Sequence, residues 1–254
     1  MIESVNTQQQ TQFRILLIGD NCTDVYQYGT VDRLSPEAPV PVFVPTRTEE
    51  RNGMAGNVFN NLEALGCHVN YLHGETSTKT RLIDQRSKQQ VVRIDNDVES
   101  TPITFETAIP NTYDAIVISD YNKGTVSYEL MEEIIATVKC PVFIDTKKTN
   151  LARLEGSWVK INELEHSKLK SECTGLIVTR GDKGAKVMHH NIECSAPRVE
   201  VADVTGAGDT FLAAFAYQYI NTKNLLQSIS FAISASSVTV QHIGCYSPTL
   251  EEIK

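Results

Sequence analysis

The sequence predicts an α/β fold, in which a central, mainly parallel sheet is covered by helices on both faces. Apolar runs of strand length alternate with segments of helical period along most of the chain, which is typical of a parallel sheet. These runs are apolar at nearly every position, as in residues 13–18, and this indicates strands buried on both faces. A chain of 254 residues with 41% hydrophobic content can form one sizeable core. We therefore expect a single domain at residues 13–254, after a disordered polar tail at residues 1–12.

The first half of the chain is expected to provide strands, one helix and a small β lid. Four prolines between residues 36 and 45 exclude a helix and a central strand there, and favour an edge hairpin or an extended flap. The expected lid comprises residues 26–45 and 78–96. The elements expected in this half are a strand at residues 13–18 that ends at Gly19 and Asp20, a helix at 55–65 with Gly66 as its C-cap, and strands at 69–72, 79–83 and 91–94.

The second half alternates regularly between strand and helix. The expected strands are residues 114–118, 141–144, 158–161 and 176–179, and the expected helices are residues 128–138, 206–220 and 225–240. Ligands of such sheets bind beyond the carboxyl ends of the strands. The residues that end the expected strands are therefore candidates for the site, and they include Asp20, Asp120, Asp145, Asn162 and Thr179.

Charge and composition exclude several classes of partner. The net charge of −8 argues against nucleic acid and anionic membranes, because the field of the protein would repel polyanions. No apolar stretch has the length of a membrane span, and the N-terminal residues lack the apolar core of a signal peptide. The six cysteines are scattered and never spaced as C-x-x-C, which favours reduced thiols over a disulfide framework or a zinc site. We expect a cytoplasmic protein.

The most informative segment is the string D-V-T-G-A-G-D-T at residues 203–210, directly before an apolar helix. Two glycines and an alanine allow a tight turn at the helix start, where free N–H groups point at an anion. Asp209 would stand beside this anion hole. Phosphoryl transfer needs this combination of donors for the moving phosphoryl group and a carboxylate that takes the hydroxyl proton.

Three other interpretations fit residues 203–210 less well. A helix cap would explain one aspartate and one glycine, since the helix dipole favours an acid in the first turn, but it does not explain the whole string. A dinucleotide fingerprint fails because Phe211 occupies the position of its third glycine and no acidic residue follows at the required distance. A Walker P-loop occurs nowhere in the chain.

Residues 203–209 resemble the C-terminal signature of the PfkB/ribokinase family of sugar kinases. In that family the last aspartate is the catalytic base, and the Gly-Ala-Gly backbone forms the anion hole. The resemblance implies these roles for Asp209 and for Gly206, Ala207 and Gly208. It also implies a ribokinase-like fold, with ATP and Mg²⁺ as cofactors.

Further segments resemble the same family in the same order. Residues 19–24 resemble its opening motif, residues 162–165 its N-x-x-E motif for the magnesium and phosphate region, and residues 179–184 a turn that contacts the nucleotide. Alone, an N-x-x-E pattern indicates only a solvated helix start. The implied roles are substrate binding for Asp24, nucleotide binding for Asn162, Glu163, Glu165, Thr179, Gly181, Gly184 and Lys147, and an indirect contact with the metal, through water, for Glu165.

Several segments are closest to the D-glycero-D-manno-heptose 7-phosphate kinases of bacteria. They are residues 28–29, 33–42, 78–82, 89–95, 119–124 and 144–147. The resemblance implies that ATP phosphorylates the anomeric hydroxyl of the heptose 7-phosphate. Arg33 and Arg93, with Lys79 and Arg81, could form charge-assisted bonds to the substrate phosphate. Each of these cations is equally well explained as an exposed residue of a flap strand.

The chain also departs from the family pattern. Met54 stands between Gly53 and Asn57, two expected substrate-binding residues, where relatives have a second glycine that lets the backbone hinge. Ile233 occupies a place where relatives often carry asparagine near the adenine. Only three residues separate Gly74 from Thr78, where relatives have a helix and a strand. The sheet is therefore expected to lack one strand.

Three functional hypotheses remain open at this point. The first is the heptose 7-phosphate kinase, and the second is another sugar or nucleoside kinase of the same fold. The third is a catalytically silent relative that binds sugar and nucleotide, which the shortening and Met54 would favour. A homodimer through the β lid is expected, because lid strands 40–44 and 91–94 would present apolar faces.

Overall fold

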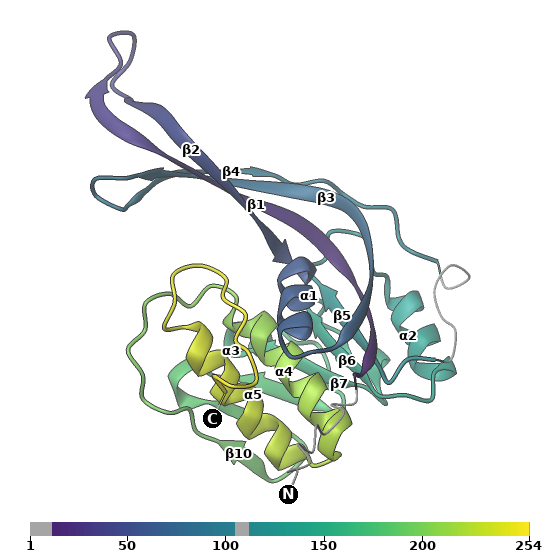
Figure 1. The fold of residues 1–254 in the computed structure, drawn as a ribbon. Coiled ribbons are helices and arrows are strands. Elements are labelled where there is room, and N and C mark those ends of the chain that lie inside the picture. Colours follow the sequence, from purple (N-terminus) through teal and green to yellow (C-terminus); the bar gives the residue numbers. More distant parts are fainter. Residues whose placement is uncertain (1–11, 105–111, 254) are drawn as a thin grey trace, which may run out of the picture.

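The computed structural model describes residues 12–104 and 112–253, and it has the α/β architecture that the sequence predicts. A ten-stranded sheet is covered by helices on both faces (Figure 1). Its strands are β1 (Arg14–Leu34), β2 (Pro41–Met54), β3 (His68–Asp84), β4 (Gln90–Asn96), β5 (Ala115–Asp120), β6 (Val142–Thr146), β7 (Trp158–Asn162), β8 (Leu176–Thr179), β9 (Ala185–Val187) and β10 (Ile192–Cys194). The helices are α1 (Ala55–Ala64), α2 (Tyr128–Thr137), α3 (Glu163–His166), α4 (Ala207–Thr222) and α5 (Leu225–Thr239), with short 3-10 helices η2 (Leu151–Leu154) and η3 (Gly181–Lys183). The expected tail lies almost entirely outside the described residues.

The sheet brings the ends of its parallel strands to one edge. The strand order is β10-β9-β8-β7-β6-β5-β1-β3-β4, and β2 pairs with β1 beside this path. The neighbours from β3 through β1, β5, β6 and β7 to β8 are parallel. Their carboxyl ends therefore meet at the same edge, where ligands bind in sheets of this kind.

Two apolar cores lie on opposite faces of the sheet. Ile15 and Leu17 of β1 belong to the core formed with α1, α4 and α5, whereas Leu16 and Ile18 belong to the core formed with α2. All four side chains are buried. Burying a side chain of this size stabilises a fold by about 1.5–3 kcal/mol. The two cores explain why the strand is apolar at every position rather than at every second one.

Strand β1 is much longer than the sequence predicted. It was expected to end at Gly19 and Asp20, but it continues to Leu34. Up to Gly19 it pairs with β5, and from Asn21 onward it pairs with the antiparallel strand β2. The prediction was wrong because a new hydrogen-bonding partner replaces β5 where the apolar run stops, and polar residues then continue the strand.

Strand β3 joins two segments that were expected to be separate strands. It runs parallel to β1 from the pair of Arg14 with His68 to the pair of Gly29 with Asp84. Three residues between Gly74 and Thr78 are too few for a helix and a further strand, and the chain proceeds directly into the lid. Strand β4 pairs with β3 only from Thr78 onward, so residues 68–77 have no second neighbouring strand among those described.

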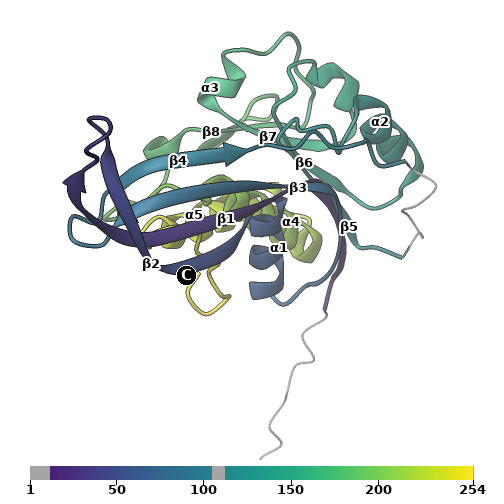
Figure 2. The same cartoon turned by 90° about the horizontal axis from the view of Figure 1, so that it is seen from above.

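The lid consists of β2, β4 and the second halves of β1 and β3, and it projects from the body of the protein (Figures 1 and 2). The turn at residues 35–40 contains Pro36 and Pro39, and Pro41 begins β2, so the prolines stand at the hairpin as expected. Cross-strand pairing places Tyr26 opposite both Glu49 and Arg81, and Arg81 opposite Arg93. Directly opposed residues share a face, so one lid face is rich in charge.

Some elements were not predicted. The hairpin of β9 and β10 and the single-turn helices contain three or four residues each, too few to show a period in the sequence. Within the described part of the chain no helix has both the length and the apolar character needed to cross a membrane. The six cysteines are free thiols, in line with their spacing.

Candidate active site

Asp209 lies in the first turn of α4, within hydrogen-bonding reach of two other elements. The amide Nδ2 of Asn57 in α1 donates to its Oδ2 at 2.8 Å, and the hydroxyl of Tyr121 donates to its Oδ1 at 2.8 Å. The side chain is only 6% exposed. A simple helix cap would be solvated, so this placement favours a functional carboxylate over a cap.

Burial gives Asp209 the proton affinity of a general base. Loss of solvent raises the pKa of its carboxyl group to about 6. The hydrogen bond from Asn57 opposes that rise, the negative charge of Asp145 adds to it, and Lys160 and Tyr121 lower the pKa again. The carboxylate is therefore ionised at neutral pH, yet its pKa is close enough to that pH for it to accept and release a proton.

The backbone before Asp209 provides an anion site. Gly206 has a φ of 80° and is the N-cap of α4, and the N–H of Thr210 bonds to its carbonyl oxygen at 2.9 Å. The N–H groups of Gly208 and Asp209 have no partner among the described residues, as is usual for the first turn of a helix. A Cβ on Gly206 would lie 2.7 Å from Nδ2 of Asn57, so only glycine fits there.

Asp203 opens the same string but has a structural role. Its Oδ1 accepts hydrogen bonds from the N–H and the hydroxyl of Thr205, and its Oδ2 accepts one from the N–H of Gly244 at 2.9 Å. These bonds tie the turn before α4 to the C-terminal loop. Asp203 and Asp209, the first and last acidic residues of this string, therefore have different roles.

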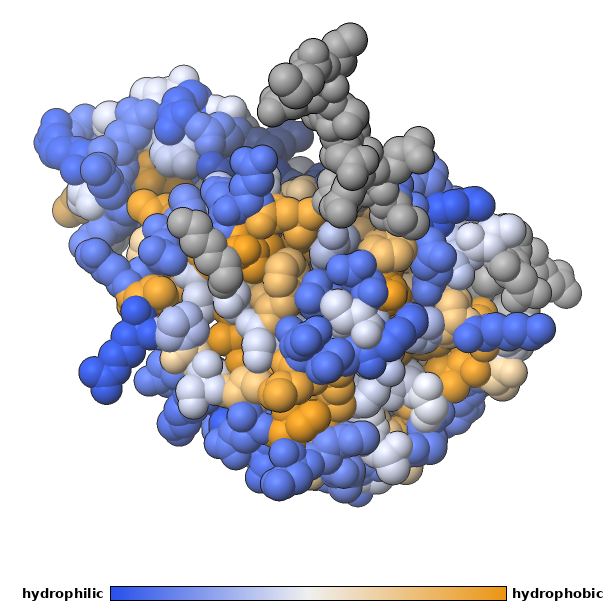
Figure 3. Space-filling model, turned by 60° about the horizontal axis from the view of Figure 1, so that its bottom comes forward, coloured by the Kyte–Doolittle hydropathy of each residue, from blue (hydrophilic) through white to orange (hydrophobic). Residues whose placement is uncertain are grey.

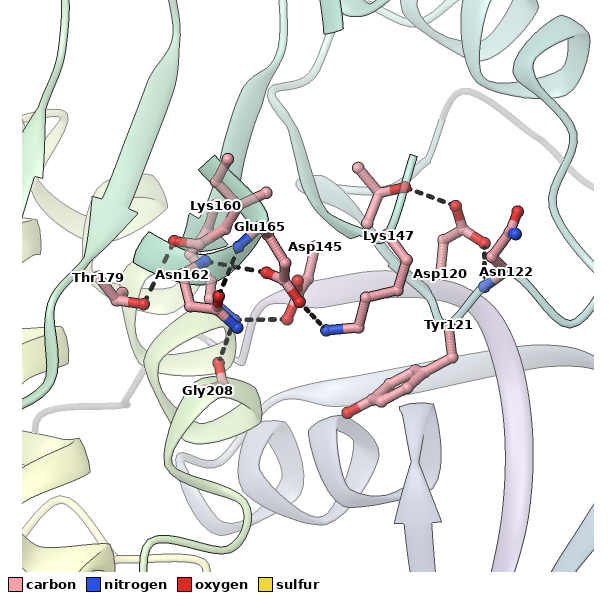
Figure 4. A network of polar contacts seen from close by, with 12 residues as sticks. Asp120, Tyr121, Asn122, Asp145, Lys147, Lys160, Asn162, Glu165, Thr179 and Gly208 are labelled. Carbon is pink, nitrogen blue, oxygen red and sulfur yellow. Dashed lines mark hydrogen bonds and ion pairs between the residues drawn. The ribbon is translucent and has the colours of Figure 1, made fainter. Parts of the chain in front are cut away.

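A buried ion pair between Lys160 and Asp145 contacts the backbone of the anion site. The sequence did not predict this pair. The ammonium of Lys160 in β7 bonds to Oδ2 of Asp145 in β6 and to the carbonyl oxygen of Gly208 at 3.2 Å (Figure 4). Lys160 is 5% exposed and Asp145 is 6% exposed. A buried pair of this kind is strongly destabilised if one partner is removed. Asp145 was a candidate as a strand end, but nothing in the sequence singled out Lys160.

The residues expected on the nucleotide side meet at the neighbouring strand ends. Asn162 caps α3, its side chain accepting from the N–H of Glu165, while Glu165 accepts in return from the N–H of Asn162. The other oxygen of Glu165 pairs with the ammonium of Lys147 (Figure 4). Burial alone would lower the pKa of Lys147, but Asp145, Glu165 and Asp209 outweigh it and raise that pKa. Glu163 lies in the same turn and is exposed.

Thr179 and the turn that follows it, which contains Gly181 and Gly184, lie beside Asn162 and α3. Thr179 is opposite Asn162 in the pairing of β8 with β7. Gly181 and Gly184 frame η3 with φ values of 57° and 86°. A Cβ on Gly184 would come within 2.0 Å of the carbonyl oxygen of Cys194, so glycine allows this turn to close against β10. The turn is therefore held at the same sheet edge as α3.

The chemistry of the site fits Mg²⁺, although residues 12–104 and 112–253 contain no group of three or more acidic, histidine or cysteine side chains arranged to hold a metal ion directly. Oδ1 of Asp145 is buried and has no hydrogen-bond partner in the described structure. Asp145 and Glu165 both act on Lys147, so both carboxylates lie near it. Mg²⁺ prefers oxygen ligands and keeps several waters, which suits two carboxylates that reach it through water.

The residues expected to bind the acceptor lie in the lid, in the segment that leads into α1 and in α1 itself. Asp24 is buried and pairs with Arg81, whose Nη1 lies 2.5 Å from its Oδ1. A Cβ on Gly53 would lie 2.5 Å from Oδ2 of Asp24, so glycine leaves room for this carboxylate. Asn57 of α1 links these residues to Asp209 through the hydrogen bond from its Nδ2 to Oδ2 of Asp209. Met54 has a φ of 51°, a strained conformation for a residue with a side chain.

The lid cations are distributed differently from the prediction. Arg33 is exposed at the end of β1, directly before the turn at residues 35–40. Arg93 lies opposite Arg81 but is exposed and pairs with Asp95. The sequence did not single out Arg51, whose guanidinium lies 5.0 Å from the ring centroid of Tyr26. Its Nη1 would be 2.7 Å from a Cβ on Gly244, so it lies against the C-terminal loop.

Comparison with known proteins identifies the family. The family model described as pfkB family carbohydrate kinase matches residues 55–253. The chain belongs to the pfkB family of carbohydrate kinases. It is 34% identical to the bifunctional protein HldE of Nitratiruptor sp. and 30% identical to that of Helicobacter acinonychis. These alignments cover 95% and 94% of this chain but 64% and 65% of the relatives, so the chain spans less than two thirds of their length.

Solved structures of pfkB-like kinases share the fold. The ribokinase of Thermotoga maritima has a TM-score of 0.71 at 18% identity and is covered over 98% of its length. The Arabidopsis thaliana ribokinase complexed with ribose and ATP has a TM-score of 0.70 at 17% identity and is covered over 97%. Each comparison covers 95% of this chain. The ribokinase-like fold expected from the sequence is therefore confirmed.

The alignment with HldE also bears on the shortening. It extends over 299 positions, which exceeds the 254 residues of this chain. The relative therefore has residues without a counterpart here, in line with the departure seen after Gly74. This pfkB kinase is therefore shorter than the matched region of that relative.

Proposed function

We propose that this carbohydrate kinase transfers the γ-phosphoryl group of ATP to a hydroxyl group of a sugar phosphate. The observation that carries the proposal is the buried carboxylate of Asp209, which lies beside the free N–H groups at the start of α4. Phosphoryl transfer requires little covalent chemistry from a protein, so positioning and electrostatic stabilisation supply most of the catalysis.

Each residue of the site has a separate role in the proposed reaction. The acceptor oxygen forms a bond to the γ-phosphorus, its proton passes to Asp209, and the bond to the β-phosphate oxygen breaks to release ADP. The N–H of Ala207 already donates to the carbonyl oxygen of Val204 at 3.3 Å, so the free N–H groups of Gly208 and Asp209 bind the phosphoryl oxygens as charge develops on them. Glu165, with Asn162 beside it, would hold Mg²⁺ through water, and the metal would neutralise charge on the phosphates. Thr179 and the turn of Gly181 and Gly184 contact the nucleotide, with Lys147 on the phosphate side.

The charge of the lid favours an anionic acceptor. Arg51 and Arg81 lie 5.0 and 5.1 Å from the ring centroid of Tyr26, on the lid face that meets the C-terminal loop. Arg81 pairs with Asp24, and the role of Asp24 in this proposal is to bind hydroxyl groups of the sugar. An arginine fork binds a phosphate through two parallel bonds, which a neutral sugar cannot offer. The segments that resemble heptose 7-phosphate kinases favour D-glycero-D-manno-heptose 7-phosphate as the acceptor, with the 1,7-bisphosphate as product.

An acceptor panel tests this proposal. With MgATP, we expect ADP release with the heptose 7-phosphate and at least about 100-fold lower kcat/KM with the same heptose lacking its phosphate, since a lost charge-assisted contact costs about 3 kcal/mol. Replacing Arg51 with methionine should raise KM for the phosphorylated acceptor but not for the neutral one. Faster turnover of ribose or a nucleoside would favour another kinase specificity. Binding of both ligands without turnover would indicate a silent relative.

We further propose that the protein is a cytoplasmic homodimer joined through its lids. Val92 and Ile94 of β4 are 43% and 53% exposed, on the lid face opposite to Arg81. Apolar residues on an open sheet are usually covered by a partner. The lid is not the sole apolar surface, because Figure 3 shows hydrophobic residues among hydrophilic ones on another face.

Light scattering tests the dimer. We expect a mass of twice 28.2 kDa for the native chain and a single-chain mass for Ile94→Lys. The matched control is Leu226→Lys, because Leu226 is 52% exposed on α5 and should leave the dimer intact. A monomeric native chain would contradict the proposal.

A further inference from the structure

Tyr121 lies between the carboxylate of Asp209 and the ammonium group of Lys147. It follows β5, and its backbone N–H bonds to Oδ2 of Asp20 at 2.7 Å, which fixes the main chain. Its hydroxyl donates to Oδ1 of Asp209 at 2.8 Å. The ammonium of Lys147 lies 5.3 Å from the centroid of its ring (Figure 4). One side chain therefore contacts the base and a cation of the phosphate side.

The acceptor hydroxyl must bind a carboxylate that already has two donors. Asn57 holds Oδ2 and Tyr121 holds Oδ1, and each oxygen has a second lone pair. With both donors in place the carboxylate cannot rotate, so the free lone pairs keep one direction. Burial raises the pKa of Tyr121 well above its ordinary value, and the hydroxyl therefore remains a donor wherever Asp209 is ionised.

We propose that Tyr121 is a positioning residue of this kinase, whose hydroxyl orients the carboxylate of Asp209 toward the acceptor and whose ring supports Lys147. The inference rests on the proposed role of Asp209 as the base. A donated hydrogen bond stabilises the ionised carboxylate, so it also sets the pH at which the base becomes available. A ring below an ammonium adds a cation–π attraction of about 0.5–1 kcal/mol.

Other groups act on Asp209 from every element packed around it, and they are unchanged in the variants below. These groups are Asn57 of α1, Asp145 of β6, Lys147 after β6, Lys160 of β7 and Cys245 of the C-terminal loop. A change in the pH dependence after substitution of Tyr121 alone can therefore be assigned to its hydroxyl or its ring.

Tyr121→Phe separates the hydroxyl from the ring. Without the donor, we expect the acid limb of kcat, near pH 6 in the native protein, to move up by about one pH unit, because hydrogen bonds to charged groups contribute about 1.5–3 kcal/mol. The KM for MgATP should stay unchanged, since the ring still supports Lys147.

Tyr121→Leu removes the ring as well and should raise the KM for MgATP by about threefold. The matched control is Tyr128→Phe, whose hydroxyl accepts from the N–H of Asn150, and its acid limb should not move.

Fluorotyrosine at position 121 provides a second test that leaves the shape of the side chain nearly unchanged. The fluorinated ring makes the hydroxyl a stronger donor, so the acid limb should move to lower pH, opposite to Tyr121→Phe. This arm decides the question if Tyr121→Phe does not fold. An unmoved limb in the folded variants would overturn the inference while leaving Asp209 as the base. Full turnover by Asp209→Asn would instead overturn the proposed function.

Discussion

Replacing Asp209 with asparagine is expected to abolish most of the activity while making the protein more stable at neutral pH. The amide cannot accept the acceptor proton, and removing a general base typically lowers kcat by about 10²–10⁴. Because the backbone N–H groups of α4 and the nucleotide residues are unchanged, KM for MgATP should stay near its native value. Steady-state ADP release at pH 8, with saturating acceptor, measures both quantities.

The gain in stability follows from the pKa of the same carboxyl group. Burial raises that pKa from 3.8 to about 6, so the folded state binds the proton more tightly than the unfolded state does. The stabilisation is fully present below pH 3.8 and is lost as the pH rises through 6, which leaves a buried charge in the native protein. A shift of this size corresponds to about 3 kcal/mol above pH 6, and the asparagine variant avoids this cost.

Urea unfolding at pH 4 and pH 8 tests this prediction. The difference in free energy of unfolding between Asp209→Asn and the native chain should be small at pH 4 and favour the variant at pH 8. Asp120→Asn provides the contrast, because Asp120 is buried in an ion pair with Lys148, and its removal should destabilise the protein at pH 8. Equal turnover in Asp209→Asn and the native protein would contradict its role as the base.

Gly206→Ala is expected to impair both folding and turnover. The residue has a φ of 80°, and a Cβ there would lie 2.7 Å from the amide of Asn57. Relief of that contact displaces Asn57 from Oδ2 of Asp209, so the base loses one of its two donors. We expect the free energy of unfolding to fall by about 1–3 kcal/mol and kcat to fall by about 100-fold, the effect of a misplaced catalytic group.

The variant Gly66→Ala separates the effect of backbone strain at a positive φ from the effect of the contact with Asn57. Gly66 has a φ of 83°, almost that of Gly206, but no atom lies within 4 Å of the position of its Cβ. This control should lose stability from backbone strain of about 1 kcal/mol, with kcat unchanged. Chemical denaturation and ADP release measure the two effects. A kcat for Gly206→Ala equal to that of Gly66→Ala would show that the contact with Asn57 does not matter.

The elements of the site that lie close together in the sequence were predictable. The anion site and Asp209 are contiguous, so the glycines, the helix start and the acid are visible in one string. The parallel core was equally visible, because strands buried on both faces are apolar throughout. Asn162 and Glu165 are three residues apart, and their reciprocal bonds were readable as a helix start.

Contacts between distant segments could not be predicted in the same way. The hydroxyl of Tyr121 reaches Asp209 across 88 residues, and Lys160 reaches Gly208 across 48. A lone tyrosine or lysine carries no local signal of such a partner. The length of β1 was missed because its second half alternates and pairs with a strand that begins beyond a proline-rich turn.

The uninterrupted course of β3 has a consequence for how the acceptor enters. In the described structure β1 and β3 pass from body to lid as one hydrogen-bonded ribbon, broken only by the irregularity between Gly19 and Asn21. No flexible linker interrupts this ribbon, so a change in the angle of the lid would require the ribbon itself to bend. Since Asp20 lies at the irregularity and holds the N–H of Tyr121, bending at that point would also shift the loop beside Asp209.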